Sequence, residues 1–97
     1  MFKDDLINET CELFKVHPRD LLGSYRFKFL MPPRFALAKA LRMRGWTYTR
    51  IANLMACDHT SVMYRVREAE FWMSRDPKFA EKVNHLASLG KETGNAA

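Results

Sequence analysis

Apolar residues recur at helical spacing along most of the chain, so the pattern predicts an all-helical fold. The segment 4–16 places its apolar residues mostly on one helical face, namely Leu6, Ile7, Cys11, Leu13 and Phe14. Pro18 and Gly23 frame a helix of one or two turns, which we expect to end in a left-handed glycine cap. Residues 24–31 alternate like a strand, but they have no strand to pair with. We therefore expect an extended or irregular linker there.

The remaining segments predict four more helices. Pro32 and Gly45 frame the first, whose apolar side is formed by Phe35, Leu37, Ala38 and Leu41. Thr47 can cap a short second helix that carries Ile51, Leu54 and Met55. After a tight turn, a third runs from about His59 to about Ser74, with an inward face of Val62, Val66, Ala69 and Met73. Asp76 and Pro77 open the last helix, which we expect to stop at Gly90 and to bury Phe79, Val83, Leu86 and Leu89.

These segments predict a compact domain of about six helices over residues 1–90 and a disordered tail over 91–97. Both tryptophans, Trp46 and Trp72, are expected in the core, as is the thiol of Cys11, whereas Cys57 falls in the predicted turn. Two helices joined by a short turn are typical of a helix-turn-helix.

The charge distribution indicates a polyanionic partner. The net charge is +5, yet residues 15–67 hold eleven lysines and arginines against only Asp20 and Asp58. A basic centre between near-neutral ends is the electrostatic signature of nucleic-acid binding.

The stretch "DHTSV", residues 58–62, opens the third of these helices with four consecutive polar residues. One of them, Asp58 or Thr60, suffices to cap a free backbone N–H. The N-terminal residues of a recognition helix read base edges in the major groove, for which Asp58, His59 and Thr60 are suited, while Ser61 can meet a phosphate. Base reading explains the residues that capping does not require. Arg65 and Arg67 are candidates for phosphate contacts, with a solvated surface arginine as the open alternative for each, and Tyr64 either touches DNA or is simply exposed.

"DHTSV" resembles the D-H-T-T-V signature of the DNA-binding C-terminal domain of DnaA, the bacterial replication initiator. The resemblance extends through "VHPRDLLGSYRFK", "PPRFALAKAL" and "TRIANL" and covers roughly residues 3–90. It implies an all-α, TrpR-like fold in which a helix-turn-helix reads the major groove of double-stranded DNA. It also implies that Arg26 enters the minor groove. The implied DNA contacts elsewhere are Lys28, Arg34, Arg42, Thr47, Tyr48 and Thr49.

The chain departs from the family pattern at several of these motifs. Cys57 stands where the family has an arginine before Asp-His-Thr, and Glu68 replaces a basic residue. Phe27 and Phe29 occupy loop positions where small polar residues are common. We expect one or both to pack against the core and so hold the loop in place. The departures leave the target sequence open.

The sequence indicates no catalysis. It lacks the G-x-x-x-x-G-K-[ST] phosphate loop, and 97 residues leave no room for a nucleotide-binding domain. No His, Cys and acid set has metal-ligand spacing, so we expect no metal, cofactor or small-molecule substrate. Acids at the N-terminus do not suit a signal peptide, and no apolar stretch is long enough for a membrane. We expect a cytoplasmic, nucleoid-associated regulator of transcription or replication, from a bacterium or phage.

Two other functions remain open. A protein-interaction adaptor could use the acids of the first helix, Asp4, Asp5, Glu9 and Glu12, as a docking surface. An RNA binder would need exposed aromatic rings that stack on splayed bases, and Phe27 and Phe29 are its candidates.

Overall fold

The computed structural model describes residues 2–89, and within them the fold is all-helical, as predicted. The elements in chain order are α1 (Phe2–Phe14), α2 (Pro18–Leu22), the 3-10 helix η1 (Lys28–Leu30), α3 (Met31–Met43), α4 (Tyr48–Met55), α5 (His59–Met73) and α6 (Pro77–Ser88). The expected stop at Gly90 and the expected tail lie outside the described residues.

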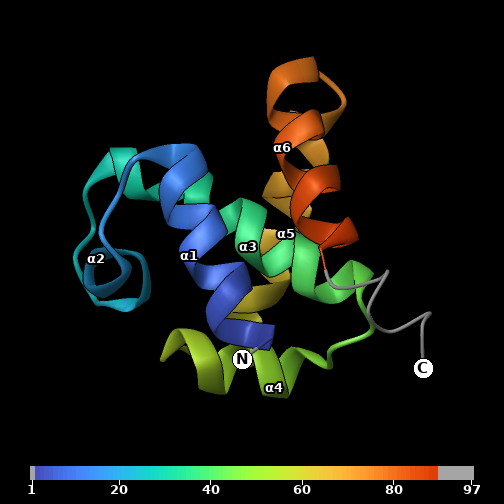
Figure 1. Ribbon diagram of the computed structural model, residues 1–97. Helices are drawn as coiled ribbons and strands as arrows, with labels where there is room; N and C mark the ends of the chain where they lie inside the picture. The colour runs from blue at the N-terminus through green and yellow to red at the C-terminus, as the bar shows by residue number, and fades with distance from the viewer. Residues whose placement is uncertain (1, 90–97) are drawn as a thin grey trace.

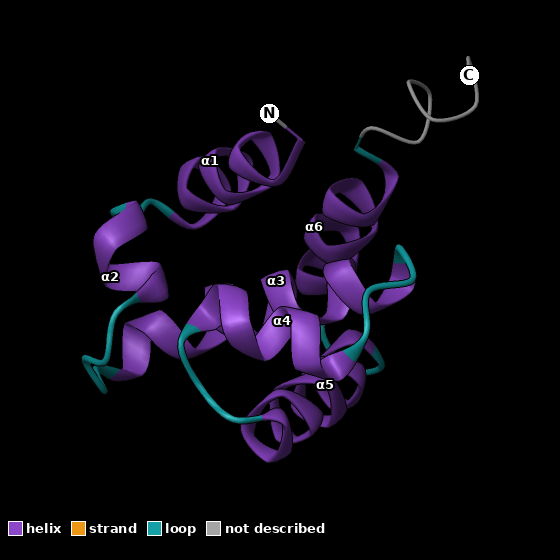
Figure 2. Cartoon of the chain, turned by 90° about the horizontal axis from the view of Figure 1, so that it is seen from below, coloured by secondary structure: helices purple, strands orange, loops and turns teal. Residues whose placement is uncertain are grey.

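Helix α3 is the centre of the fold and packs against all the other helical elements (Figure 1). The view from below shows α1 and α5 on opposite sides of it (Figure 2). Its predicted apolar residues Phe35, Leu37, Ala38 and Leu41 are all buried, and so are Ala36 and Ala40. Small alanine side chains let neighbouring helices approach on several sides, which a one-sided apolar pattern does not reveal.

The other predicted helix faces also enter this core. Leu6, Ile7 and Cys11 come from α1, Val62, Val66 and Ala69 from α5, and Phe79, Val83 and Leu86 from α6. Burial raises the pKa of the Cys11 thiol, which fits its expected packed position. Trp46 is buried as expected, but the expectation for Trp72 is wrong because 44% of its surface is exposed. Trp72 lies near the end of α5 and lines an open surface hollow, so its ring is not enclosed in the core.

The turn after α2 differs from the prediction. Gly23 has φ −85° and ψ −170°, so it ends α2 in an extended conformation and not in a left-handed cap. A Cβ at this position would lie 2.6 Å from the backbone oxygen of Arg19. Glycine is therefore required here for a close backbone approach.

Residues 24–27 form the expected irregular segment, but the chain then coils into η1 and runs directly into α3. Leu30 at the end of η1 is fully buried and anchors this junction in the core. We call residues 24–29 the basic loop.

Candidate nucleic-acid interface

The N-terminus of α5 is exposed and is capped by Asp58. The Ser61 amide donates a hydrogen bond of 2.8 Å to Oδ1 of Asp58, so Asp58 and not Thr60 is the cap. The backbone enters this cap through Ala56, whose φ of 56° and ψ of 46° are left-handed. His59 and Thr60 are exposed, and neither side chain is hydrogen-bonded to another described residue. Capping thus accounts for Asp58, and the next two side chains are available to a partner.

The cap makes helix stability depend on pH. Hydrogen bonds from the backbone and the side chain of Ser61 lower the pKa of Asp58. A carboxylate with a lowered folded-state pKa adds stability that is complete above the ordinary aspartate pKa of about 4. This contribution is lost as the pH falls through the lower folded-state value.

We expect both Asp58→Asn and Asp58→Ala to remove the acid-dependent contribution to stability. We expect only Asp58→Ala to destabilise the fold markedly at neutral pH. Asparagine keeps an oxygen acceptor for the Ser61 amide, whereas alanine does not. Thermal unfolding followed by circular dichroism between pH 2.5 and pH 7 measures both effects. The same acid dependence in wild type and Asp58→Asn would show that the cap carries no such linkage.

A second group of predicted contacts lies at the start of α4. Thr47 caps this helix by accepting a hydrogen bond of 3.1 Å from the Arg50 amide, as predicted. Nη1 of Arg42 donates to the Trp46 carbonyl at 2.6 Å, and its guanidinium lies 4.4 Å from the centre of the Tyr48 ring. Arg42 and Tyr48 are half-buried, and Thr47 and Thr49 are exposed. The structure therefore brings these four predicted residues together.

Arg50 on α4 was not predicted as a contact. Its exposed guanidinium lies 3.7 Å from the centre of the Trp46 ring and so covers the buried tryptophan. The sequence signal was available, since Arg50 directly follows Thr49 and is a basic residue in the first turn of α4.

A groove connects the basic loop to α5. It encloses about 350 Å³, and its lining includes Arg26 from the loop, Cys57 from the turn, and Ser61 and Arg65 from α5. Nη1 of Arg65 contacts the sulfur of Met55 at 3.8 Å, which holds the guanidinium against α4. Arg26 of the basic loop thus lies beside the start of α5.

Arg34 is not placed as expected for a phosphate contact, because only 3% of its surface is exposed. Its guanidinium donates to four backbone carbonyls, those of Leu21 at 3.0 Å, Tyr25 at 2.6 Å, Asp20 at 2.7 Å and Gly23 at 3.1 Å. Burial lowers its pKa, and the nearby charges of Arg65 and Arg26 lower it further against the opposing effect of Asp20. Arg34 therefore ties α2 and the basic loop to α3.

The loop phenylalanines also differ from the prediction. Phe27 and Phe29 are 56% and 60% exposed, so they do not pack into the core and do not hold the loop in place. Arg34 holds the loop instead. The sequence could not distinguish these roles, since a loop phenylalanine is ordinarily expected inside and an arginine outside.

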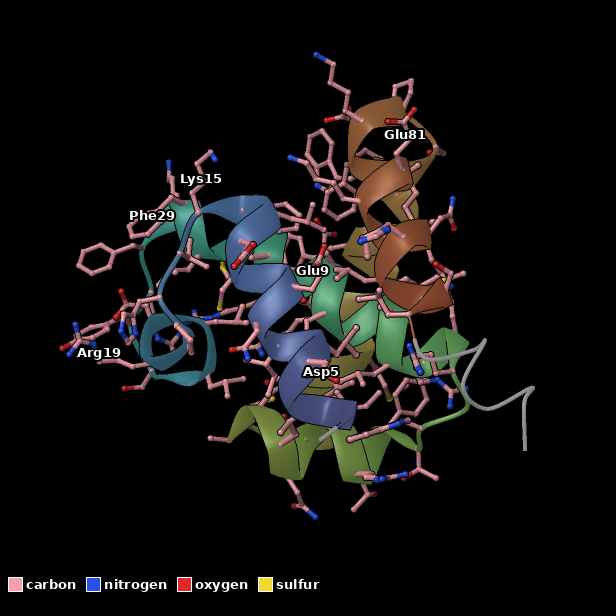
Figure 3. All side chains as sticks on the ribbon, viewed as in Figure 1. Asp5, Glu9, Lys15, Arg19, Phe29 and Glu81 are labelled. Atoms are coloured by element: carbon pink, nitrogen blue, oxygen red, sulfur yellow. The ribbon has the colours of Figure 1, made fainter. Side chains whose placement is uncertain are left out.

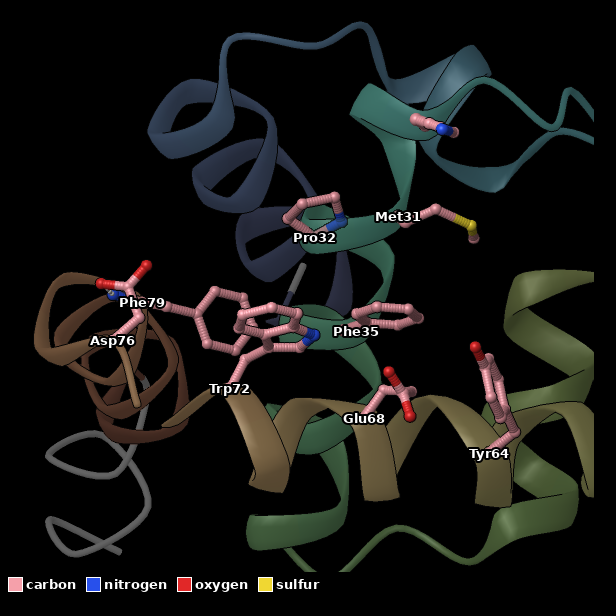
Figure 4. A pocket seen from close by; sticks show the side chains of 9 residues that line it. Met31, Pro32, Phe35, Tyr64, Glu68, Trp72, Asp76 and Phe79 are labelled. Atoms are coloured by element: carbon pink, nitrogen blue, oxygen red, sulfur yellow. Dashed lines mark hydrogen bonds between the residues drawn. The ribbon is translucent and has the colours of Figure 1, made fainter. Parts of the chain in front are cut away.

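Lys28 lies beside a second, more apolar hollow of about 490 Å³. Phe35 forms its floor on α3, and Tyr64, Glu68 and Trp72 line it from α5 (Figure 4). Tyr64 is 49% exposed and packs edge-on against Phe35, with 6.0 Å between ring centres. Lys28 is exposed, but it borders this hollow, while Arg26 borders the groove.

The acidic first helix is only partly available as a docking surface. Asp5 and Glu12 are exposed, whereas the Glu9 carboxylate lies 2.8 Å from Nε2 of His85 on α6. The side chain of Asp4 lies outside the described residues.

Among the described residues there is no group of His, Cys, Asp and Glu arranged to hold a metal ion. No described helix is both long and apolar enough to cross a membrane.

Comparison with known proteins supports a relation to DnaA. The chain is 29% identical over 85 residues to the chromosomal replication initiator protein DnaA of Jannaschia sp. (strain CCS1). The aligned region covers 86% of this chain but only 18% of that protein. No family model matches the chain. The similarity supports a domain related to part of DnaA.

Proposed function

We propose that this domain binds double-stranded DNA sequence-specifically, with α4 and α5 as a helix-turn-helix and α5 as the recognition helix. The observation that carries the proposal is the exposed N-terminus of α5, where the side chains of His59 and Thr60 make no hydrogen bond to another described residue next to the capping Asp58. The similarity to a replication initiator supports the choice of DNA as the partner.

The surrounding residues have the chemistry of backbone contacts. Ser61 and Arg65 lie in the groove beside α5, and Arg42, Thr47 and Thr49 gather at the start of α4. Hydroxyls and guanidiniums that flank a recognition helix bind phosphate oxygens and fix its register on the duplex. We propose that the domain acts as a regulator of transcription or replication and has no ATPase activity.

Arg26 is proposed to enter the minor groove next to the site read by α5. A narrow A·T-rich minor groove has enhanced negative potential and attracts arginine. We expect Arg26→Ala to lose affinity mainly on duplexes in which an A·T tract flanks the major-groove site. Arg26→Lys should restore only part of the loss, because an ammonium is more strongly hydrated than a guanidinium.

The test starts with duplexes selected from a random pool by the full chain. Wild type and Arg26→Ala are then compared on paired duplexes that differ only in an A·T or G·C flank. The proposal for Arg26 is contradicted if the variant retains the wild-type preference for the A·T flank. Failure of the pool to yield any preferred sequence would contradict the proposed function itself.

A further inference from the structure

The basic loop displays a strip of three aromatic rings that the proposed duplex contacts do not use. Tyr25, Phe27 and Phe29 are 56%, 56% and 60% exposed. The ring centres of Tyr25 and Phe27 lie 5.7 Å apart, and those of Phe27 and Phe29 also lie 5.7 Å apart with only 17° between their planes. We call these three rings the aromatic strip. Figure 3 shows Phe29 at the outer edge of the molecule.

The strip is separate from the groove and the hollow beside α5. Arg26 lines the groove and Lys28 lines the apolar hollow, but none of the three rings lines either. The alternation along the loop thus directs the two cations toward α5, while the rings stay in solvent. A duplex held by α5 and Arg26 would not account for the strip.

The loop backbone that carries the strip is firmly anchored. Arg34 bonds the carbonyls of Tyr25 and Gly23, and Leu30 just beyond the strip is fully buried. The rings are therefore exposed on a backbone that the core holds in place. Stacking on such a pre-organised surface costs less conformational entropy than stacking on a loop that must first become ordered.

We propose that the aromatic strip binds unpaired bases of single-stranded nucleic acid. Duplexes hide their base faces inside the stack, whereas an unpaired base offers a flat face that exposed aromatic rings can cover. The charge of the surroundings is complementary to a nucleic-acid backbone. Lys15 and Arg19 are exposed and lie on the same side of the molecule as Phe29 in Figure 3. This inference does not depend on duplex recognition by α5.

The test uses the full chain and a fluorescein-labelled oligothymidylate of about 20 nucleotides, longer than the site of a single small module. Phe27→Ala combined with Phe29→Ala should weaken binding about 30-fold or more, since each base–aromatic stack contributes at least a severalfold factor. The slope of log affinity against log salt should stay unchanged, because the double variant keeps every cation. Phe27→Trp combined with Phe29→Trp retains flat rings and should bind at least as tightly as wild type.

Phe71→Ala is the matched control, since Phe71 is also exposed, at 45%, but lies on α5 and packs against Trp72 and not against the strip. It should leave oligothymidylate binding unchanged. Wild-type binding by the double alanine variant, or loss of affinity for duplex instead of single strand, would overturn the proposal. So would ring-dependent binding to vesicles of anionic lipid, or ring-dependent dimers, without binding to oligothymidylate. Binding to the selected duplex tests the proposed function, whereas binding to oligothymidylate tests the aromatic strip, so the two proposals can fail independently.

Discussion

Replacing Arg34 with alanine is expected to destabilise the fold by about 3 kcal/mol or more, the largest single effect that we predict for a polar residue. The substitution removes a charged donor from four carbonyls, those of Leu21, Tyr25, Asp20 and Gly23. The Asp20 carbonyl keeps its hydrogen bond from the Gly23 amide, but the other three carbonyls lose the partner that Arg34 provides, and a buried carbonyl without a partner bears the cost of desolvation. Arg34→Lys should recover only part of the stability, because one ammonium cannot reproduce the planar fork of a guanidinium.

Urea unfolding followed by circular dichroism measures this effect, with Arg67→Ala as the control. Arg67 is exposed on α5, so its removal should change the unfolding free energy by about 0.5 kcal/mol or less. If Arg34→Ala unfolded at the wild-type urea concentration yet bound duplex with a shallower salt dependence, Arg34 would be a phosphate contact after all.

The second large effect concerns base reading by α5. We expect His59→Ala and Thr60→Ala each to lower affinity for the preferred duplex by about 1–3 kcal/mol and to leave binding to random duplex almost unchanged. The physical reason is that base contacts carry specificity while phosphate contacts carry general affinity. Both side chains are exposed and contribute little to the core, so the fold should tolerate their removal.

Two matched variants separate the kinds of contact at this helix start. Thr60→Val keeps the methyl group and should preserve a contact with a thymine methyl, whereas Thr60→Ala removes it. Ser61→Ala should weaken preferred and random duplex alike, as expected for a phosphate contact. Binding titrations on the two duplexes measure both, and equal losses on the two DNAs for His59→Ala would refute its role as a base reader.

The helices and the N-terminal caps of α4 and α6 could be predicted from the sequence because they depend on local patterns. Apolar spacing predicted the inward faces of α1, α5 and α6, and the polar residues Thr47 and Asp76 sit at the predicted helix starts. The sequence could not show whether Asp58 or Thr60 caps α5, since both side chains can accept an amide hydrogen bond. The position of the Ser61 amide in the structure identifies Asp58 as the cap.

The basic loop could not be predicted in the same way because its structure depends on contacts between distant positions. Arg34 bonds the Asp20 carbonyl, fourteen positions away, and no periodicity reports such a contact. Without it, the phenylalanines were the natural candidates to hold the loop. Because Arg34 holds the loop, Phe27 and Phe29 are not needed for packing and remain exposed. Their rings are therefore available to contact a binding partner.

The central proposal is that this domain recognises a particular sequence in double-stranded DNA. The most direct test measures the affinity of the full chain for one duplex selected from a random pool and for a scrambled duplex of the same length and composition, at one salt concentration. The account predicts that the selected duplex binds about a thousandfold or more tightly. Equal affinities for the two, with the same steep loss of binding as salt increases, would show a nonspecific polyanion binder and contradict the account.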